Sequence, residues 1–526
     1  MYKNWFLSIA LLLLLPAPVP AAVIHVPGDQ LTIQAGINAA SDGDTVLVAD
    51  GTYTGSGNRD IDFHGKRITV QSESGADYCI IDCQESYRGF YFHSGEGSGS
   101  VVKGFTIQNG FHDDIGGAIY CDNASPRIMN NIINGNAAVY GGGIFCYLGS
   151  PIITKNIISG NNGNYEGGGI YCSESSAIIA NNLIFNNWTD EHGGGGILCG
   201  GPIGSTVSPV IINNTIRNNL ADTDGGGIWC RGGSVTIMDN IITDNEALIR
   251  CGGIYCWETS AIIKDNTIST NTAGTEGGGI HCDSSDVSII NNKIIGNRAD
   301  GDEFSAGGGI YCLDIDSASK IMNNIILYNY AFYHGAGICC YHCSPTMINN
   351  TIVQNTANNS GGGIFCGGNN ASPIITNTIF WGNTASSGKE IYIGIFDSPA
   401  TLTINYSDVE GGQSSVYVET NCTLNWGAGM MDTDPLFVKG PLGKYYLSQI
   451  AAGQSQDSPC VDAGDGVIQW PCHAYSICGT TRTDIVPDSG IIDIGYHYPL
   501  VGIQIPPGSM LEEALNFGDT LLNFLN

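Results

Sequence analysis

The chain has 526 residues, with 19 Lys or Arg against 49 Asp or Glu, so its formal net charge is −30. This charge argues against nucleic acid as a partner, and it disfavours a polyanionic ligand unless a cation such as Ca²⁺ bridges the two. Only 13% of the residues are charged and 74 are glycine, a composition that fits a stacked β-structure and argues against disorder.

The first 22 residues have the pattern of a secretion signal. Lys3 is followed by an apolar run from Leu11 to Leu15 and then by small residues at Ala21 and Ala22. The apolar run is too short to cross a bilayer, and no other stretch reaches spanning length. We therefore expect a secreted, extracellular or cell-surface protein that has no transmembrane segment beyond the signal.

Residues 23–54 are predicted to form an N-terminal cap and the first strand. A short amphipathic helix is expected around Ile33 and Ile37, ahead of an apolar strand at Val46 to Val48. If the following region is a solenoid, such a segment is needed, because the open end of a solenoid exposes its core.

A six-residue phrase, Gly-Gly-Gly-Ile-aromatic-Cys, organises the region from 55 to 430. Residues 141–146 and 225–230 are full copies, and the steps between successive phrase cysteines range from 25 to 31 residues. A fixed period of this size indicates a repeat architecture. The phrase cysteines are Cys121, Cys146, Cys172, Cys199, Cys230, Cys256, Cys282, Cys312, Cys340 and Cys366.

Each repeat also carries two asparagines about five positions apart, such as Asn240 and Asn245, between short runs rich in Ile, Val and Thr. Runs so short and so β-branched are strands rather than helices. We predict three short strands in each coil of about 26 residues, and hence an all-β parallel β-helix. Inward cysteines and corner asparagines should stack in structural columns, with each asparagine bonded to the ones above and below.

The repeat resembles the right-handed parallel β-helix repeat proteins of the pectin-lyase-like superfamily, of the secreted bacterial type. The resemblance rests on the Gly-Gly-Gly-Ile-x-Cys and Asn-Asn-x-Ile-x-x-Asn phrases and covers residues 23–500. It implies a single-stranded right-handed solenoid with caps at both ends. Because that superfamily contains lyases, glycosidases, epimerases and non-catalytic surface proteins, the resemblance leaves the activity open.

The repeat pattern ends by residue 430, and residues 431–500 resemble the C-terminal closing region of such proteins. Cys460, Cys472 and Cys478 lie there, away from the phrase column, and one pair could form a disulfide. For the column itself we expect buried thiols. Residues 501–526 form a tail that resembles the start of a truncated anchoring module, with a frayed terminus as the alternative.

A stripe of aromatic side chains is predicted on the outer face of the phrase strand, because side chains alternate along a strand and the flanking Ile and Cys point inward. Flat faces beside polar groups suit a sugar chain, whereas the alternative is that the stacked aromatics only stabilise neighbouring coils. The candidate ligand-binding residues are Tyr171, Trp229, Tyr255 and Tyr311 from the stripe, with His192 and Glu276 from the turn before the strand.

Two functions remain open. The first is a non-catalytic carbohydrate-binding or adhesive solenoid whose partner is a polysaccharide or cell-surface glycan, and near-uniform repeats favour it. The alternative is a polysaccharide-degrading hydrolase or lyase. Glycoside cleavage needs two carboxylates about 5–9.5 Å apart, and acidic turns on adjacent coils could provide them. The candidate catalytic residues are Glu166, Asp190, Glu191 and Asp224.

The motifs of polygalacturonases and pectate lyases are absent, apart from one Asp-Asp pair at 113–114. No metal site is predicted, since the cysteines are spread along an axis. Acidic clusters such as residues 300–303 would suit Ca²⁺, although no spacing matches a defined calcium loop. We expect a monomer.

Overall fold

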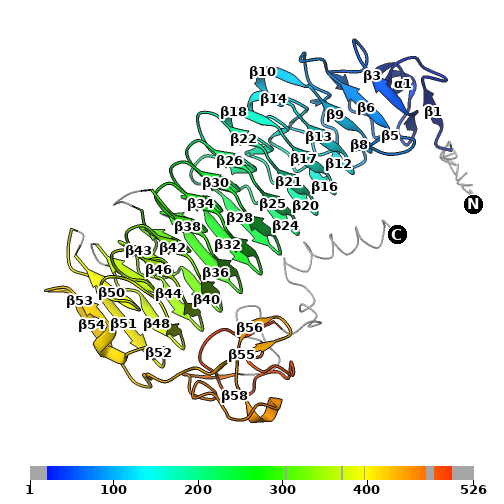
Figure 1. The fold of residues 1–526 in the computed structure, drawn as a ribbon. Coiled ribbons are helices and arrows are strands. Elements are labelled where there is room, and N and C mark those ends of the chain that lie inside the picture. Colours follow the sequence, from blue (N-terminus) through cyan, green and yellow to red (C-terminus); the bar gives the residue numbers. More distant parts are fainter. Residues whose placement is uncertain (1–19, 302–304, 369–370, 396, 469–478, 500–526) are drawn as a thin grey trace, which may run out of the picture.

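The computed structural model describes residues 20–301, 305–368, 371–395, 397–468 and 479–499, and its main part is a long solenoid of parallel strands (Figure 1). Strands of successive coils pair in register, as Ile228 with Ile254 and Cys230 with Cys256. Apart from short 3₁₀ turns, the described residues contain a single seven-residue helix. The predicted all-β solenoid is confirmed.

One coil illustrates the path of the chain. It runs through β27 (Ile228–Arg231), β28 (Ser234–Met238), β29 (Ile241–Thr243) and β30 (Glu246–Ala247) before the next phrase strand, β31 (Ile254–Trp257). The coil therefore has four strands, one more than predicted. The missed strand is only two residues long here, too short to produce a recognisable pattern of alternation in the sequence.

Stacking of the coils produces four parallel sheets. The phrase sheet has 14 strands from β4 (Ile61–Asp62) to β53 (Tyr417–Val418), and the long sheet has 16 from β1 (Val23–Val26) to β54 (Thr423–Trp426). The middle sheet has 14 strands from β3 (Gly51–Tyr53) to β52 (Asp408–Val409). The short sheet has ten, from β10 (Phe111–Ile115) to β46 (Thr356–Ala357).

The core is filled by columns of apolar side chains. Ile and Cys of the phrase point inward as predicted, and every phrase cysteine is at most 1% exposed. All 17 cysteines among the described residues are free thiols, so the expectation of buried thiols holds there. Cys460 is one of them, whereas Cys472 and Cys478 lie outside the described residues and the proposed disulfide stays a prediction.

Two ladders of buried asparagines run along the solenoid at the corners on either side of the middle sheet. Asn240 Oδ1 accepts hydrogen bonds from the backbone N and the Nδ2 of Asn214, at 2.9 and 3.1 Å, and Asn240 Nδ2 donates to Asn266 Oδ1 at 3.0 Å. Each asparagine thus satisfies backbone groups that the corner leaves without a strand partner. The predicted stacking of asparagines is confirmed.

The two ladders end in residues other than asparagine. In the first ladder, Thr378 follows Asn350, whose backbone N donates to the threonine hydroxyl at 3.4 Å. In the second, the carboxyl group of Glu390 takes the place of the next asparagine and accepts from the backbone N and the Nδ2 of Asn383, at 3.1 and 2.5 Å. Glu390 stands where other coils have the third phrase glycine.

Helix α1 (Ile33–Ala39) packs on the first strands at the N-terminal end (Figure 1). Thr32 caps it by accepting a hydrogen bond from Ala35 N at 3.2 Å. Gly36 allows the close approach, since a Cβ there would lie 2.8 Å from Val46 Cγ1.

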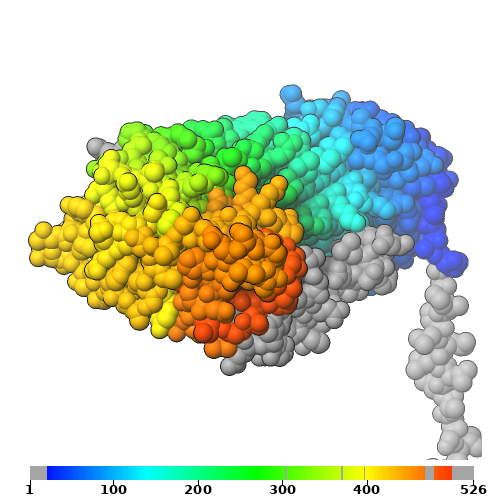
Figure 2. All heavy atoms as spheres, turned by 60° about the horizontal axis from the view of Figure 1, so that its bottom comes forward, coloured from blue at the N-terminus to red at the C-terminus, as the bar shows by residue number. Residues whose placement is uncertain are grey.

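The described residues after 430 lie beside the last coils (Figures 1 and 2). They include an antiparallel pair, β55 (Phe437–Gly440) and β56 (Gly443–Leu447). Tyr446 of β56 packs with Tyr496 and Tyr498 on the middle sheet, against Ile325 and Leu327. These contacts place the described part of 431–500 along the flank of the solenoid. No helix among the described residues is long and apolar enough to cross a membrane.

Candidate functional site

The aromatic stripe on the phrase sheet is real but buried. Trp229 and Tyr255 are 2% and 1% exposed, and Tyr171 and Tyr311 are each 5% exposed. The expectation of a solvent-facing platform is therefore wrong, because the chain that forms the short sheet folds back over this face. The rings stack along the axis, with centroids of Trp229 and Tyr255 6.0 Å apart.

The turn between the short sheet and each phrase strand supplies the cover. Its residues bridge from coil to coil in a column that includes Asp224, Arg250 and Glu276. In one coil the column position is Gly193, and a Cβ there would contact the backbone O of Asp224 and lie 2.7 Å from Trp229 Cε3. The large indole of Trp229 thus fits because the neighbouring coil has no side chain at this position.

Glu166 is held by an arginine that the sequence analysis did not select. Both of its carboxylate oxygens accept hydrogen bonds from Arg231, from Nη1 at 2.8 Å and from Nη2 at 3.0 Å, across 65 residues of sequence. Arg231 Nη2 also donates to the Tyr171 hydroxyl at 2.6 Å, and the guanidinium carbon lies 5.3 Å from the Trp229 ring centroid. This is a bidentate pair around a carboxylate that is itself only 3% exposed.

Asp224 forms a second pair of the same kind. Arg250 donates from Nε to Asp224 Oδ1 at 2.9 Å and from Nη2 to Oδ2 at 2.8 Å. The side chain of Asp224 is 4% exposed and that of Arg250 is 38% exposed. The Arg250 guanidinium also lies over the Tyr255 ring, 5.4 Å from its centroid. Both buried carboxylates thus have both oxygens occupied.

A pocket of about 330 Å³ opens between these two ion pairs. The aromatic rings of Trp229 and Tyr255 line it from the stripe, and Trp257, 37% exposed, lines it from the strand end. Its volume is within the range of small-molecule sites. The full lining is His192, Thr223, Asp224, Trp229, Arg231, Ile249, Arg250, Tyr255 and Trp257.

Several buried polar atoms at this pocket have no hydrogen-bond partner. They are Trp229 Nε1, Thr223 Oγ1 and His192 Nδ1, although His192 Nδ1 lies 3.5 Å from Glu166 Oε1 and makes an ionic contact there when the ring is protonated. Buried polar groups are normally satisfied, so this concentration of exceptions at one pocket is unusual.

The predicted site residues are therefore only partly brought together. Trp229, Tyr255, His192 and Asp224 line the pocket, and Glu166 and Tyr171 stand behind it by holding Arg231. The sequence prediction did not include Arg231 and Trp257, which each follow a phrase cysteine. Strand alternation could have pointed to them, because it places that residue on the same face as the aromatic residue before the cysteine.

The other candidates lie elsewhere. Asp190 and Glu191 are exposed in the turn before Gly193 and do not line the pocket. Glu276 is one coil further along, next to Tyr311, and burial raises the pKa of its carboxyl group. No contact in the structure indicates a ligand at Asp190, Glu191, Glu276 or Tyr311, and the predicted roles of these four residues stay predictions.

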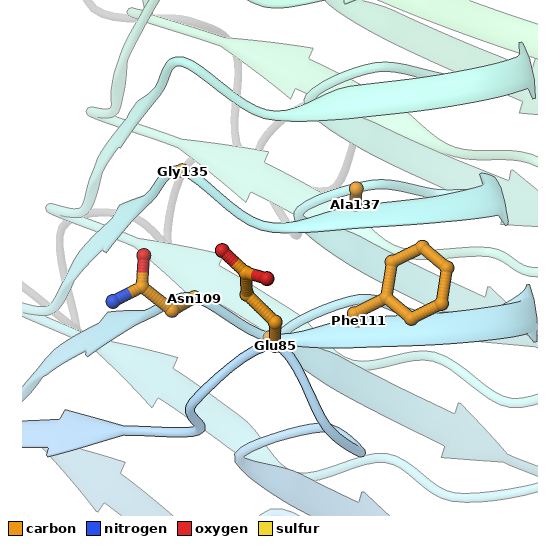
Figure 3. Close-up of a pocket in the computed structure, with 6 residues that line it drawn as sticks. Glu85, Asn109, Phe111, Gly135 and Ala137 are labelled. Atoms are coloured by element: carbon orange, nitrogen blue, oxygen red, sulfur yellow. The ribbon is translucent and has the colours of Figure 1, made fainter.

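A second pocket, of about 360 Å³, lies near the N-terminal end of the short sheet (Figure 3). Figure 3 shows the Glu85 carboxylate between Asn109 and Phe111. Phe111 is 46% exposed, and Gly110, Gly135 and Ala137 complete the lining. No buried side-chain atom without a partner occurs among its lining residues, so it is the weaker candidate.

Among the described residues, no group of three or more His, Cys, Asp or Glu side chains is placed to hold a metal ion. The suggested cluster at 300–303 falls partly outside the described residues. Ca²⁺ remains an expectation from composition alone.

Comparison with known proteins supports the fold. A family model described as right handed beta helix region matches residues 149–273 and 203–380. The repeat region is a right-handed β-helix. The handedness expected from the resemblance is thereby confirmed for this β-helix, while no curated protein matches the sequence.

Thirteen chains of solved structures are similar to this β-helix. The catalytic unit of a thermostable GH87 alpha-1,3-glucanase from Streptomyces thermodiastaticus is 13% identical, with 84% of this chain and 72% of that chain covered and a TM-score of 0.44. An alginate lyase is 12% identical, with 78% and 84% covered and a TM-score of 0.34. The A-module of a mannuronan C-5 epimerase from Azotobacter vinelandii is 12% identical, with 77% and 96% covered and a TM-score of 0.28. At these values the likeness carries no information on activity.

Proposed function

We propose that the protein is a non-catalytic saccharide-binding solenoid, secreted or held at the cell surface, and that the pocket between Arg231 and Arg250 is its ligand site. The observation that carries this proposal is the pocket itself. It combines the partly exposed ring of Trp257 with guanidinium donors and with buried polar atoms that have no protein partner. Saccharides offer apolar ring faces and many hydrogen-bonding groups, which match both features.

The engaged carboxylates favour binding over catalysis. Hydrolysis of a glycosidic bond needs one carboxyl group to protonate the leaving oxygen and another to act as nucleophile or base. Here both oxygens of Glu166 and both oxygens of Asp224 accept hydrogen bonds from arginines. Each carboxylate is thus charge-paired with an arginine at both oxygens, and acting on a substrate would mean giving up or sharing that pairing.

The binding proposal is tested with Trp257→Ala on a polysaccharide affinity panel. Trp257 is partly exposed, so its removal should weaken retention by roughly tenfold, a loss of about 1.4 kcal/mol, and leave the melting temperature nearly unchanged. Tyr78→Ala is the matched control, since Tyr78 is 60% exposed and lies far along the chain. Equal retention of both variants and the unchanged protein on every column would contradict the proposal.

The enzyme alternative is distinguished from the binding proposal by measuring reducing-end release from neutral and acidic polysaccharides, with and without Ca²⁺. We expect no release. Release from any substrate that is lost in Glu166→Gln or Asp224→Asn would replace the binding proposal by a hydrolase.

A further inference from the structure

The hydrogen-bonding groups of the pocket between Arg231 and Arg250 are unevenly satisfied. Each carboxylate oxygen already accepts a hydrogen bond from a guanidinium that also neutralises its charge. Three donors have no protein partner: Arg231 Nε and Arg250 Nη1, on arginines that are not fully buried, and the buried Trp229 Nε1–H. A ligand that fits must bring acceptors.

The charge of the pocket is balanced. Each guanidinium faces one carboxylate, so the two pairs together carry no net charge, while the whole chain carries −30. An anionic group would be repelled by the overall field and would find no uncompensated cation. The favoured acceptor is therefore an uncharged one.

The remaining wall of the pocket is apolar. Ile249, 44% exposed, and Trp257, 37% exposed, line it beside Trp229 and Tyr255. Leu248, 51% exposed, precedes Ile249 in the same turn. Apolar surface left in water at a pocket mouth is stabilised when a small apolar group of a ligand covers it.

A group with a neutral acceptor and an apolar end is an acetyl group. Resting on the saccharide-binding function proposed above, we infer that the pocket recognises the acetyl substituent of an acetylated sugar, as an acetamide or an acetate ester. The carbonyl oxygen accepts from Trp229 Nε1–H or from a free guanidinium N–H, and the methyl group packs on the wall of Ile249 and Trp257. The partly exposed ring of Trp257 holds the sugar ring.

The test is a calorimetric comparison of matched oligosaccharides with the full chain. Tetramers of β-linked N-acetylglucosamine are compared with tetramers of β-linked glucose and of glucuronate, and O-acetylated xylo-oligosaccharides are compared with the same material after mild deacetylation. We expect at least one acetylated member to bind about tenfold or more tightly than its partner, and the member that does so distinguishes amide from ester.

The matched variant is Trp229→Phe, which removes the Nε1–H and keeps an aromatic ring. Because that N–H has no partner in the protein, the melting temperature should change little while the preference for the acetylated sugar falls. Trp381→Phe, on the outer side of the middle sheet, is the control and should keep the preference.

Several outcomes would overturn the inference. Equal affinity for the acetylated and unacetylated sugars, or tighter binding of the glucuronate tetramer, would reject acetyl recognition and leave saccharide binding standing. A Trp229→Phe variant with an unchanged preference would reject the role of the indole donor. Absence of binding to every sugar would instead reject the proposed function itself.

Discussion

Arg231 binds the Glu166 carboxylate at both oxygens, 2.8 and 3.0 Å away, although the two residues are 65 positions apart in the chain. The pair spans two coils of the solenoid, roughly 10 Å along its axis. It therefore ties together coils that are not adjacent and fixes one side of the proposed binding pocket.

Removal of the arginine should cost far more than removal of the pair. Arg231→Ala leaves the Glu166 carboxylate, 3% exposed, without its counter-ion, and we expect a loss of about 3 kcal/mol in the free energy of unfolding. The double variant Glu166→Gln with Arg231→Met should recover most of that loss. Urea denaturation of the unchanged protein, the single variant and the double variant measures the loss and its recovery. Equal stability of the single and double variants would contradict this prediction.

Gly193 should be intolerant of any side chain. A Cβ at this position would contact the Asp224 backbone O and lie 2.7 Å from the Trp229 ring, so Gly193→Ala should reduce stability by about 1–3 kcal/mol. It should also weaken saccharide binding by displacing the indole. Gly97→Ala is the control, because a Cβ there meets no atom within 4 Å. Similar melting temperatures for the two variants would show that the contact is unimportant.

Interruption of an asparagine ladder should destabilise the solenoid strongly. Asn240→Ala removes the acceptor of the Asn214 backbone N and Nδ2 and the donor to Asn266. Since buried groups left unpaired cost about 1–3 kcal/mol each, we expect a loss of about 3 kcal/mol or more in thermal or urea unfolding. Asn164→Ala, at an exposed position outside both ladders, should have almost no effect, and a comparable loss there would contradict the role of the ladder.

Glu390 should make the stability of the last coils depend on pH. Burial raises the pKa of Glu390 to about 8, from an ordinary value of 4.5. The folded chain therefore keeps this proton at pH values where the unfolded chain releases it, so the free energy of unfolding falls as pH rises from 4.5 to about 8. The slope from this group is at most about 1.4 kcal/mol per pH unit.

Glu390→Gln should remove that slope, whereas Glu246→Gln, at an exposed position, should keep it. The measurement is the free energy of unfolding in urea at several pH values between 4 and 9. A slope that is identical in all three proteins would show that Glu390 does not titrate between the folded and unfolded states.

The phrase cysteines should react with thiol reagents only after unfolding. They are at most 1% exposed, and burial raises the pKa of the Cys230 and Cys366 thiols well above the ordinary value. Because the thiolate is the reactive form, an aromatic disulfide reagent should label the native protein slowly, with Cys422, the one partly exposed thiol among the described residues, reacting first. Rapid labelling of many thiols in the native protein would contradict the buried column.

The sequence by itself determined the repeat, the inward columns and the asparagine ladders. Their cause is local and periodic: β-branched runs form strands, alternation sends Ile144 and Cys146 to one side, and a corner asparagine such as Asn240 bonds to its copies one coil away. Because every coil repeats the same chemistry, the period in the sequence becomes the period in space.

Only the tertiary structure decided which face is open. The two-residue strands of the short sheet leave no alternation to detect, yet they bring the turn with Asp224 and Arg250 over Trp229 and Tyr255 and bury the stripe that strand alternation alone would place in solvent. The pairing of Glu166 with Arg231 likewise depends on two coils being about 10 Å apart and on Gly193 between them. Such contacts arise from where the chain returns in space, and no local pattern in the sequence records that distance.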